Sequence, residues 1–305
     1  MLAHERKIIT AASSVGEGAF ESVKNGLTFT VIGTTSRGVF LLTSIQSIIY
    51  LSTEPYSGPL TVILPVGEAC IKEIQRGDSG MLGNGFIQFS GNIIQIDSDH
   101  VWHAPRAEKM LLSKMERHAY LRQLCLQVAQ DHDGSGLGSY LHILFGTHAD
   151  QSEIDSSLME NRLFPAIEET RLRLGEYQIN QLARTLEQCI GLGRGLTPAG
   201  DDFIEGVILV LNRWKDILGL NEDLTQLNQT IITSVRQKTT SLSASLVEWA
   251  AHGHADERII DVLDAIFTGT EEIKTQAEKI LSIGHSSGVD LLTGIAVVIS
   301  SIRFD

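Results

Sequence analysis

Gly191-Leu-Gly-Arg-Gly-Leu-Thr-Pro-Ala-Gly-Asp-Asp202 is the stretch that marks the start of a helix in the second half of the chain. Thr197 is the predicted N-cap, and Pro198 suits the first helical position, where a missing N–H costs nothing. The glycines before the cap let the backbone bend and come close to a ligand. Free N–H groups and the positive end of the helix dipole favour an anion, and Arg194 adds a forked cation. We therefore predict an anion-binding loop followed by two acids.

The spacing of this loop differs from that of the known nucleotide-binding loops. A Walker loop needs Gly-Lys-Ser/Thr, and a dinucleotide loop needs Gly-x-Gly-x-x-Gly directly after a strand. The alternative interpretation is a glycine-rich loop that only allows close packing, in which Asp201 and Asp202 complement the helix dipole.

The same pattern recurs near the C-terminus. Residues 200–207 align without gaps with residues 288–295, and both read Gly, any residue, Asp, two apolar residues, any residue, Gly, apolar residue. Asp202 and Asp290 occupy matching places, and the glycine four residues after each acid would let a neighbouring helix approach closely. Two such helix starts could face one pocket, and a short packing motif used twice is the alternative. Small polar residues of the cap type precede each start: Thr197, Ser286 and Ser287.

A third predicted helix start follows Lys238 and carries hydroxyls at Thr239, Thr240 and Ser241. Capping needs only one hydroxyl, so the others, with Lys238 beside them, would suit an oxyanion; a serine-rich helix start is the alternative. His285 lies just before Asp290, where it could donate to an anion or move a proton, or serve only in a capping loop.

The rest of the chain divides into a β-rich and a helical part. Short apolar runs punctuated by glycine predict an antiparallel sheet, with a barrel as one arrangement, and residues 76–85 are too glycine-rich for regular structure. After residue 105 the periodicity becomes helical, and residues 131–138 are predicted to be a solvated connector. We therefore expect the α+β class, with a β-rich domain at 1–105 and an α-helical domain at 106–305. The predicted strands are 27–32, 39–42, 47–51, 60–64, 86–89 and 93–96, and the predicted helices are 106–130, 139–145, 152–173, 176–190, 199–216, 222–237, 242–252, 256–267, 271–282 and 289–302.

Composition excludes several classes of protein. Apolar residues at 43% and charged residues at 20% are typical of a globular chain rather than a disordered one. The net charge of −13 and the absence of a Lys/Arg run argue against nucleic acid as a partner. Cys70, Cys125 and Cys189 are far apart, so neither a disulfide framework nor a zinc site is indicated. No stretch reaches the length of a membrane span, so we expect a cytoplasmic protein without membrane association.

Taken together, three motifs closely resemble the AllH-like family. They are Gly191-Leu-Gly-x-Gly-Leu-Thr-Pro-x-Gly-Asp-Asp-Phe203, Thr239-Thr-x-Leu-Ser-Ala244 and Gly284-His-Ser-Ser-Gly-x-Asp290, and the resemblance covers about residues 190–295. It implies a subunit of a multi-subunit oxamate carbamoyltransferase of allantoin (purine) degradation, which works with companion subunits. Such an enzyme converts oxalurate and phosphate into oxamate and carbamoyl phosphate, which are all small anions.

A mechanism follows as a hypothesis. The loop would bind the carbamoyl or phosphate oxygens, the acids would orient amide nitrogens, and an acid or His285 would move the proton. Two other functions are carried alongside: a non-catalytic subunit of the same complex, and a Mg²⁺-dependent hydrolase that uses Asp201, Asp202 and Asp290. We expect no cofactor and no resident metal in the carbamoyltransferase. The predicted catalytic residues are Asp202, His285 and Asp290, and the predicted binding residues are Gly193, Arg194, Gly195, Thr197, Gly200, Asp201, Lys238, Thr239, Thr240, Ser241, Ser286 and Ser287.

Overall fold

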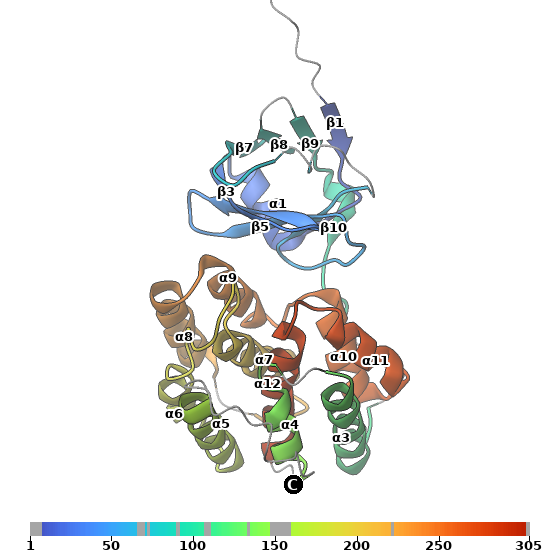
Figure 1. Ribbon diagram of the computed structural model, residues 1–305, viewed down its shortest axis with the longest axis vertical. Helices are drawn as coiled ribbons and strands as arrows, with labels where there is room; N and C mark the ends of the chain where they lie inside the picture. The colour runs from blue at the N-terminus through green and yellow to red at the C-terminus, as the bar shows by residue number, and fades with distance from the viewer. Residues whose placement is uncertain are drawn as a thin grey trace, which may run out of the picture. The chain divides into compact units, whose positions relative to one another are not determined.

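The computed structural model describes residues 8–65, 71, 74–89, 92–106, 111–132, 135–146, 160–220 and 223–302. The chain forms two compact units, Met1–Pro105 and Arg106–Asp305 (Figure 1). The described strands all lie in the first unit, together with helix α1 (Glu17–Lys24), and the other described α-helices lie in the second. This segregation of strands from helices is the predicted α+β class. Parts of the predicted helices at 106–130, 152–173 and 222–237, residues 90–91 between two predicted strands, and Cys70 lie outside the described residues.

The strands of the first unit form one curled sheet of ten strands in the described residues (Figure 1). Their spatial order is β1-β9-β8-β7-β3-β4-β5-β6-β2-β10. Alternating side chains such as Phe29 and Val31 of β3 are buried, and α1 adds Ala19 and Val23 to the same core. The strands are β1 (Ile8–Ala11), β2 (Ser14–Gly16), β3 (Thr28–Thr34), β4 (Gly38–Thr43), β5 (Ile48–Ser52), β6 (Thr61–Ile63), β7 (Ser79–Gly83), β8 (Phe86–Phe89), β9 (Asn92–Gln95) and β10 (Val101–Trp102).

The sheet differs from the sequence expectation in the direction of three strand pairs. β1 with β9, β2 with β10, and β5 with β6 are parallel, whereas the other six pairs are antiparallel. The expectation of an all-antiparallel sheet was therefore wrong at these three places. Hydrophobic alternation has the same period of two in both kinds of strand, so it carries no information about direction.

A second difference concerns residues 76–85, which were expected to be irregular. β7 lies within them, and its Gly80 is required by close approach: a Cβ there would lie 2.2 Å from the carbonyl oxygen of Gln88. The glycine serves packing between strands rather than disorder. The strands β1, β2 and β10 and the helix α1 were not predicted, because their short runs lack a clear period.

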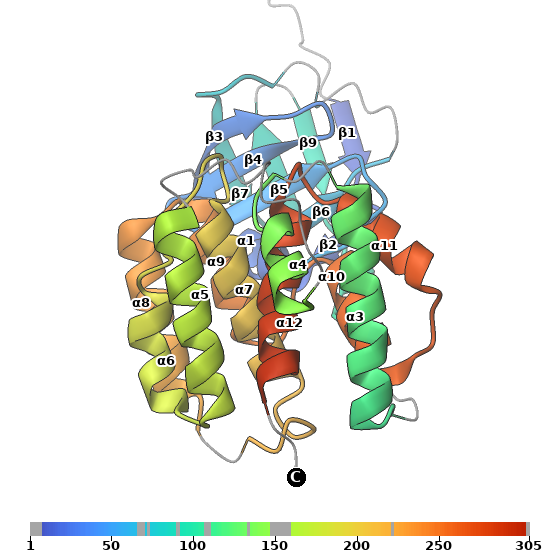
Figure 2. The same ribbon diagram turned by 60° about the horizontal axis from the view of Figure 1, so that its bottom comes forward.

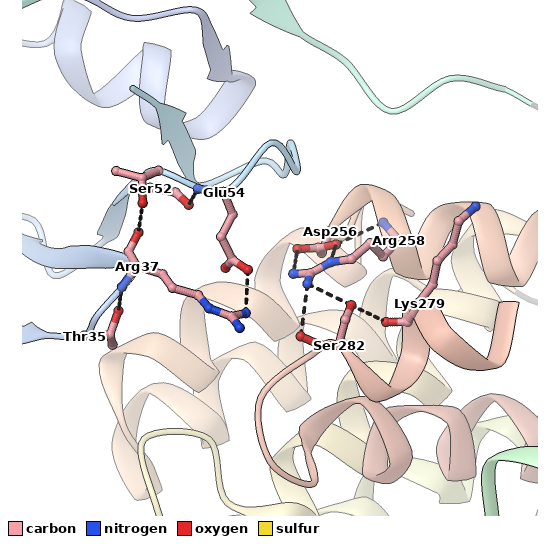
Figure 3. Close-up of polar contacts among 9 residues, drawn as sticks. Thr35, Arg37, Ser52, Glu54, Asp256, Arg258, Lys279 and Ser282 are labelled. Atoms are coloured by element: carbon pink, nitrogen blue, oxygen red, sulfur yellow. Dashed lines mark hydrogen bonds and ion pairs between the residues drawn. The ribbon is translucent and has the colours of Figure 1, made fainter. Parts of the chain in front are cut away.

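One ion pair lies beside the β4–β5 strands. Arg37 Nη1 lies 2.7 Å from Glu54 Oε1, and the backbone N–H groups of these residues donate to the hydroxyls of Thr35 and Ser52 (Figure 3). Because the Arg37 side chain is 61% exposed, this pair contributes little to stability.

The second unit is built around helices α7 and α12, which pack against each other. In Figures 1 and 2 this pair lies between α5, α6, α8 and α9 on one side and α3, α10 and α11 on the other. Residues 199–211 of α7 and 288–299 of α12 are all buried. No helix in the described part of the chain is long and apolar enough to cross a membrane. The helices are α3 (Lys114–Asp131), α4 (Gly138–Leu144), α5 (Glu160–Gly175), α6 (Ile179–Leu186), α7 (Ala199–Arg213), α8 (Thr225–Lys238), α9 (Ser241–Ala250), α10 (Glu257–Thr268), α11 (Ile273–Leu281) and α12 (Ser287–Ser301).

Two glycines let α7 and α12 touch at the backbone. A Cβ on Gly206 would lie 2.2 Å from the carbonyl oxygen of Leu291, and a Cβ on Gly294 would lie 2.2 Å from that of Phe203. The close approach predicted from the repeated Gly pattern is therefore present. It brings the first turns of the two helices, and with them Asp202 and Asp290, to one place.

Candidate functional site

The loop before α7 bends at its glycines. Gly191, Gly193 and Gly195 have φ angles of 71°, 128° and 95°, which side-chain-bearing residues rarely adopt. At Gly193 space is also limiting, because a Cβ would lie 2.5 Å from the backbone nitrogen of Ala199. The backbone bends predicted from the glycines are present, and they leave Arg194 exposed at the tip.

Asp201 fixes the base of this loop. One carboxylate oxygen accepts from the Gly191 N–H at 2.8 Å, and the other accepts from the Thr239 hydroxyl. Burial raises the pKa of Asp201, and these hydrogen bonds oppose that rise. With both oxygens engaged and only 1% of the residue exposed, Asp201 holds the loop against the start of α9.

Thr197 is not the N-cap that the sequence suggested. Pro198 is the N-cap of α7, and the Thr197 hydroxyl instead lies 2.9 Å from the hydroxyl of Ser287, at the start of α12. The expected supply of free N–H groups is also smaller than predicted. The Gly200 N–H donates to the Leu192 carbonyl at 2.8 Å, because the loop folds back onto the helix start.

Asp202 and Asp290 are both buried in the first turns of the crossing helices, at 3% and 0% exposure. Asp290 Oδ1 accepts from the Leu137 N–H at 2.5 Å. The Oδ2 atom of each acid has no hydrogen-bond partner among the described residues. A buried acceptor without a partner is costly unless a proton or a ligand satisfies it, so these two oxygens mark a place for one or both.

Burial also changes the acidity of the pair. Desolvation, together with the charges of Glu205 and Asp290, raises the pKa of Asp202 well above its usual value, although the Ser287 and Thr197 hydroxyls oppose the rise. Desolvation raises the pKa of Asp290 to about 6, against the effects of the Leu137 N–H, the Ser286 hydroxyl and His132. In both acids the site therefore favours the protonated form of the carboxyl more than water does.

The sequence interpretation missed two parts of this site. Gly136 and Leu137, which were assigned to a solvated connector, lie on Asp290: a Cβ on Gly136 would come within 2.3 Å of its Oδ1. That expectation was wrong, because nothing in the local pattern shows that the segment returns to α12. Glu205 is also buried, at 5% exposure, and desolvation with the charge of Asp256 raises its pKa to about 8. Its only sequence signal is the three-residue spacing from Asp202, on one helical face.

The other predicted residues surround this centre in different ways. The Thr240 hydroxyl caps α9 by accepting from the Ser243 N–H at 3.1 Å, and it donates to the Leu196 carbonyl at 2.6 Å. Lys238 is half-exposed and lies 3.6 Å from Glu187, so its charge is already partly satisfied. Ser241 is the first residue of α9 and its carbonyl accepts from the Ser245 hydroxyl.

The second helix start also has its own contacts. Ser286 is the N-cap of α12, and the His285 carbonyl lies 3.0 Å from His132 Nε2, with the two rings 6.3 Å apart. Within the residues that the structure describes, no three His, Cys, Asp or Glu side chains are arranged to hold a metal ion. The donor set needed by the Mg²⁺-dependent alternative is therefore not assembled there.

Residues 189–299 match the family described as oxamate carbamoyltransferase subunit AllH. The resemblance seen in the sequence is confirmed over this segment, which is AllH-like and contains both glycine-rich helix starts. No solved structure matches the chain. The family description is that of a subunit, so it points to an enzyme of several chains.

Proposed function

We propose that this chain is a working subunit of an oxamate carbamoyltransferase and that the first turns of α7 and α12 bind its small anionic ligands. One observation carries the proposal. The segment that matches the family holds two buried carboxyls, each with an oxygen that has no hydrogen-bond partner among the described residues, and the loop beside them presents an exposed arginine. Such a site offers a cation for an anionic group and acceptors for amide N–H groups.

The proposed reaction converts oxalurate and phosphate into oxamate and carbamoyl phosphate. A phosphate oxygen attacks the carbamoyl carbon of oxalurate, and the bond from that carbon to the oxamate nitrogen breaks. The proton given up by hydrogen phosphate has to reach that nitrogen. The site must therefore bind negative charge, hold N–H groups and handle one proton.

Asp202 and Asp290 suit the second and third tasks. Their Oδ2 atoms can accept from the N–H groups of the carbamoyl and amide nitrogens, which are donors that a carboxylate lacks. Because burial raises the pKa of both carboxyls and so favours their protonated forms, one of them can protonate the departing nitrogen. The other stays ionised and orients the substrate.

Arg194 suits the first task. It is exposed and forms no hydrogen bond or ion pair with a described residue, so its charge is available to a carboxylate or phosphate. The hydroxyls of Thr197 and Ser287, which lie 2.9 Å apart, can each turn toward an oxyanion while the other holds the helix starts together. His285, in the same segment, is a second candidate for moving the proton.

The test is Asp202→Asn in the complex reconstituted with its companion subunits, with the exposed Asp216→Asn as the matched control. The side-chain shape is kept, so folding should be intact, while oxamate formation should fall by about 10²–10⁴-fold because the proton donor is lost. Asp216→Asn should leave turnover unchanged. Near-normal turnover in Asp202→Asn would remove that residue from the mechanism.

A non-catalytic subunit would give a different result. Calorimetry of the full chain with oxalurate and with carbamoyl phosphate should show binding that Asp202→Asn weakens. Two results together would assign the chemistry to another subunit: normal turnover of the complex that carries Asp202→Asn, and no binding of oxalurate or carbamoyl phosphate by the chain.

A further inference from the structure

The loop before α7 is closed by two backbone hydrogen bonds. The Leu192 N–H donates to the Cys189 carbonyl at 3.1 Å, and the Gly200 N–H donates to the Leu192 carbonyl at 2.8 Å. Gly200 is required because a Cβ there would lie 2.0 Å from the Cys189 carbonyl oxygen.

The loop before α12 is closed in the same way. The Ile283 N–H donates to the Ile280 carbonyl at 3.1 Å, and the Gly288 N–H donates to the Ile283 carbonyl at 3.1 Å. A Cβ on Gly288 would lie 2.1 Å from the Ile280 carbonyl oxygen. These two bonds and this close approach in the first loop therefore each have a counterpart in the second.

The crossing of the two helices is reciprocal as well. A Cβ added to Gly206 would lie 2.2 Å from the Leu291 carbonyl oxygen, and a Cβ added to Gly294 would lie 2.2 Å from the Phe203 carbonyl oxygen. These are the same two positions of the eight-residue pattern exchanged between the helices. We infer that the loop and first turns before Val207 and those before Ile295 are two copies of one element, because the crossing contacts exchange matching positions as a local two-fold relation would require.

The copies differ by an insertion. Eight positions separate Leu192 from Gly200, whereas five separate Ile283 from Gly288, so the first loop carries three additional residues. Gly193 and Gly284, next to the shared bonds, both have positive φ, at 128° and 60°. When residues 197–199 are aligned without gaps to residues 285–287, which continues the eight-residue pattern toward the N-terminus, the three additional residues are 194–196, Arg-Gly-Leu.

This insertion is what makes the two halves chemically unlike. It contains Arg194, and the Leu196 carbonyl, held by Thr240 at 2.6 Å, fixes its end. The second loop has no such cation, because residues 280–290 contain neither Lys nor Arg. The nearby Arg258 is bound to Asp256 and donates to the carbonyl and hydroxyl of Ser282, so it anchors the second loop instead (Figure 3).

We propose that the two copies form unlike half-sites and that Arg194 is the specificity-determining residue that directs a ligand's carboxylate to the first. The second half-site, with its hydroxyls and Asp290 Oδ2, then takes the uncharged amide or carbamoyl end. Asp202 Oδ2, which is buried and has no hydrogen-bond partner among the described residues, would accept from the same ligand at the first helix. The identity of the ligand in this inference rests on the proposed function, whereas the difference between the two half-sites does not.

The test compares oxamate with oxamide, which differ only by a carboxylate and an amide, and adds inorganic phosphate as a third probe. Binding to the full chain is measured by calorimetry for the native protein, Arg194→Ala, and a deletion of residues 194–196 that copies the second loop. Arg122→Ala, an exposed arginine on α3, is the control. Circular dichroism and the Tm verify that each variant is folded.

Arg194→Ala and the deletion should weaken oxamate binding by about tenfold and leave oxamide binding unchanged, because one charge-assisted contact is lost. Equal losses for oxamate and oxamide, or no loss for either, would overturn the role of Arg194 while leaving the proposed function standing. Phosphate binding that depends on Arg194, without oxamate binding, would support the asymmetry and contradict the proposed substrate. A native chain that binds none of the three probes would overturn both.

Discussion

The crossing of α7 and α12 leads to a quantitative prediction for Gly206→Ala. The added Cβ would lie 2.2 Å from the Leu291 carbonyl oxygen, whereas ordinary contacts begin at 3.4 Å, so the helices must separate by about 1 Å. The obstacle is backbone and cannot rotate away, which places the cost at the upper end of the overpacking range, about 3 kcal/mol. Alanine returns about 1 kcal/mol through helix propensity. We expect a net destabilisation of about 2 kcal/mol.

The assay is thermal and urea unfolding of the full chain. For a helical unit of this size the Tm should fall by roughly 4–8 °C. Gly175→Ala is the control, because its Cβ would lie 3.6 Å from the nearest atom, the Ser301 carbonyl oxygen, and its stability should change by less than about 1 kcal/mol. A Gly206→Ala protein as stable as the native chain would refute the backbone contact.

The symmetry of the crossing adds a stricter test. Gly294→Ala should cost as much as Gly206→Ala, since the two contacts are equivalent. The double variant should cost less than the two single changes together, because one alanine already separates the helices. Additive losses would show that the two glycines do not share one crossing.

Three further predictions concern acidity, thiols and domains. The pKa of Asp290 is raised from 3.8 to about 6, so stability from its protonated form is complete below about pH 4 and lost as the pH rises through 6. The native chain should therefore lose about 3 kcal/mol of unfolding free energy relative to Asp290→Asn as the pH rises from 4 to 7, as measured by urea unfolding. A difference between the two proteins that does not depend on pH would contradict this. Burial raises the pKa of Cys189 to about 12, so peptide mapping should find it unmodified by iodoacetamide at pH 8 until urea is added. We also propose that the two units are separate domains: residues 106–305 expressed alone should unfold cooperatively, and a non-cooperative melt would argue against it.

The sequence by itself determined that a strand-rich part precedes a helical part, and it determined the location of the repeated helix starts. Hydrophobic period distinguishes strands from helices, and the Gly–x–Asp pattern at 200–207 and 288–295 indicated both matching acids and the close approach of two helices. These features are local, so neighbouring residues encode them. The match over residues 189–299 agrees with the motifs that carried the resemblance.

Only the tertiary structure decided which partners these residues meet. The pairing of the Thr197 hydroxyl with Ser287, the Leu137 N–H on Asp290, and the parallel strand pairs all join segments far apart in the chain. The cap preference of Thr197 describes the hydrogen bonds that its hydroxyl can make within its own turn. It does not reveal the competing partner, Ser287, on the other helix of the crossing. Likewise the three-residue insertion acquires meaning only when two loops are superimposed by their hydrogen bonds. Local propensity determines the helices and strands, whereas packing determines the contacts between them. Burial stabilises contacts between residues that come together only when the chain folds.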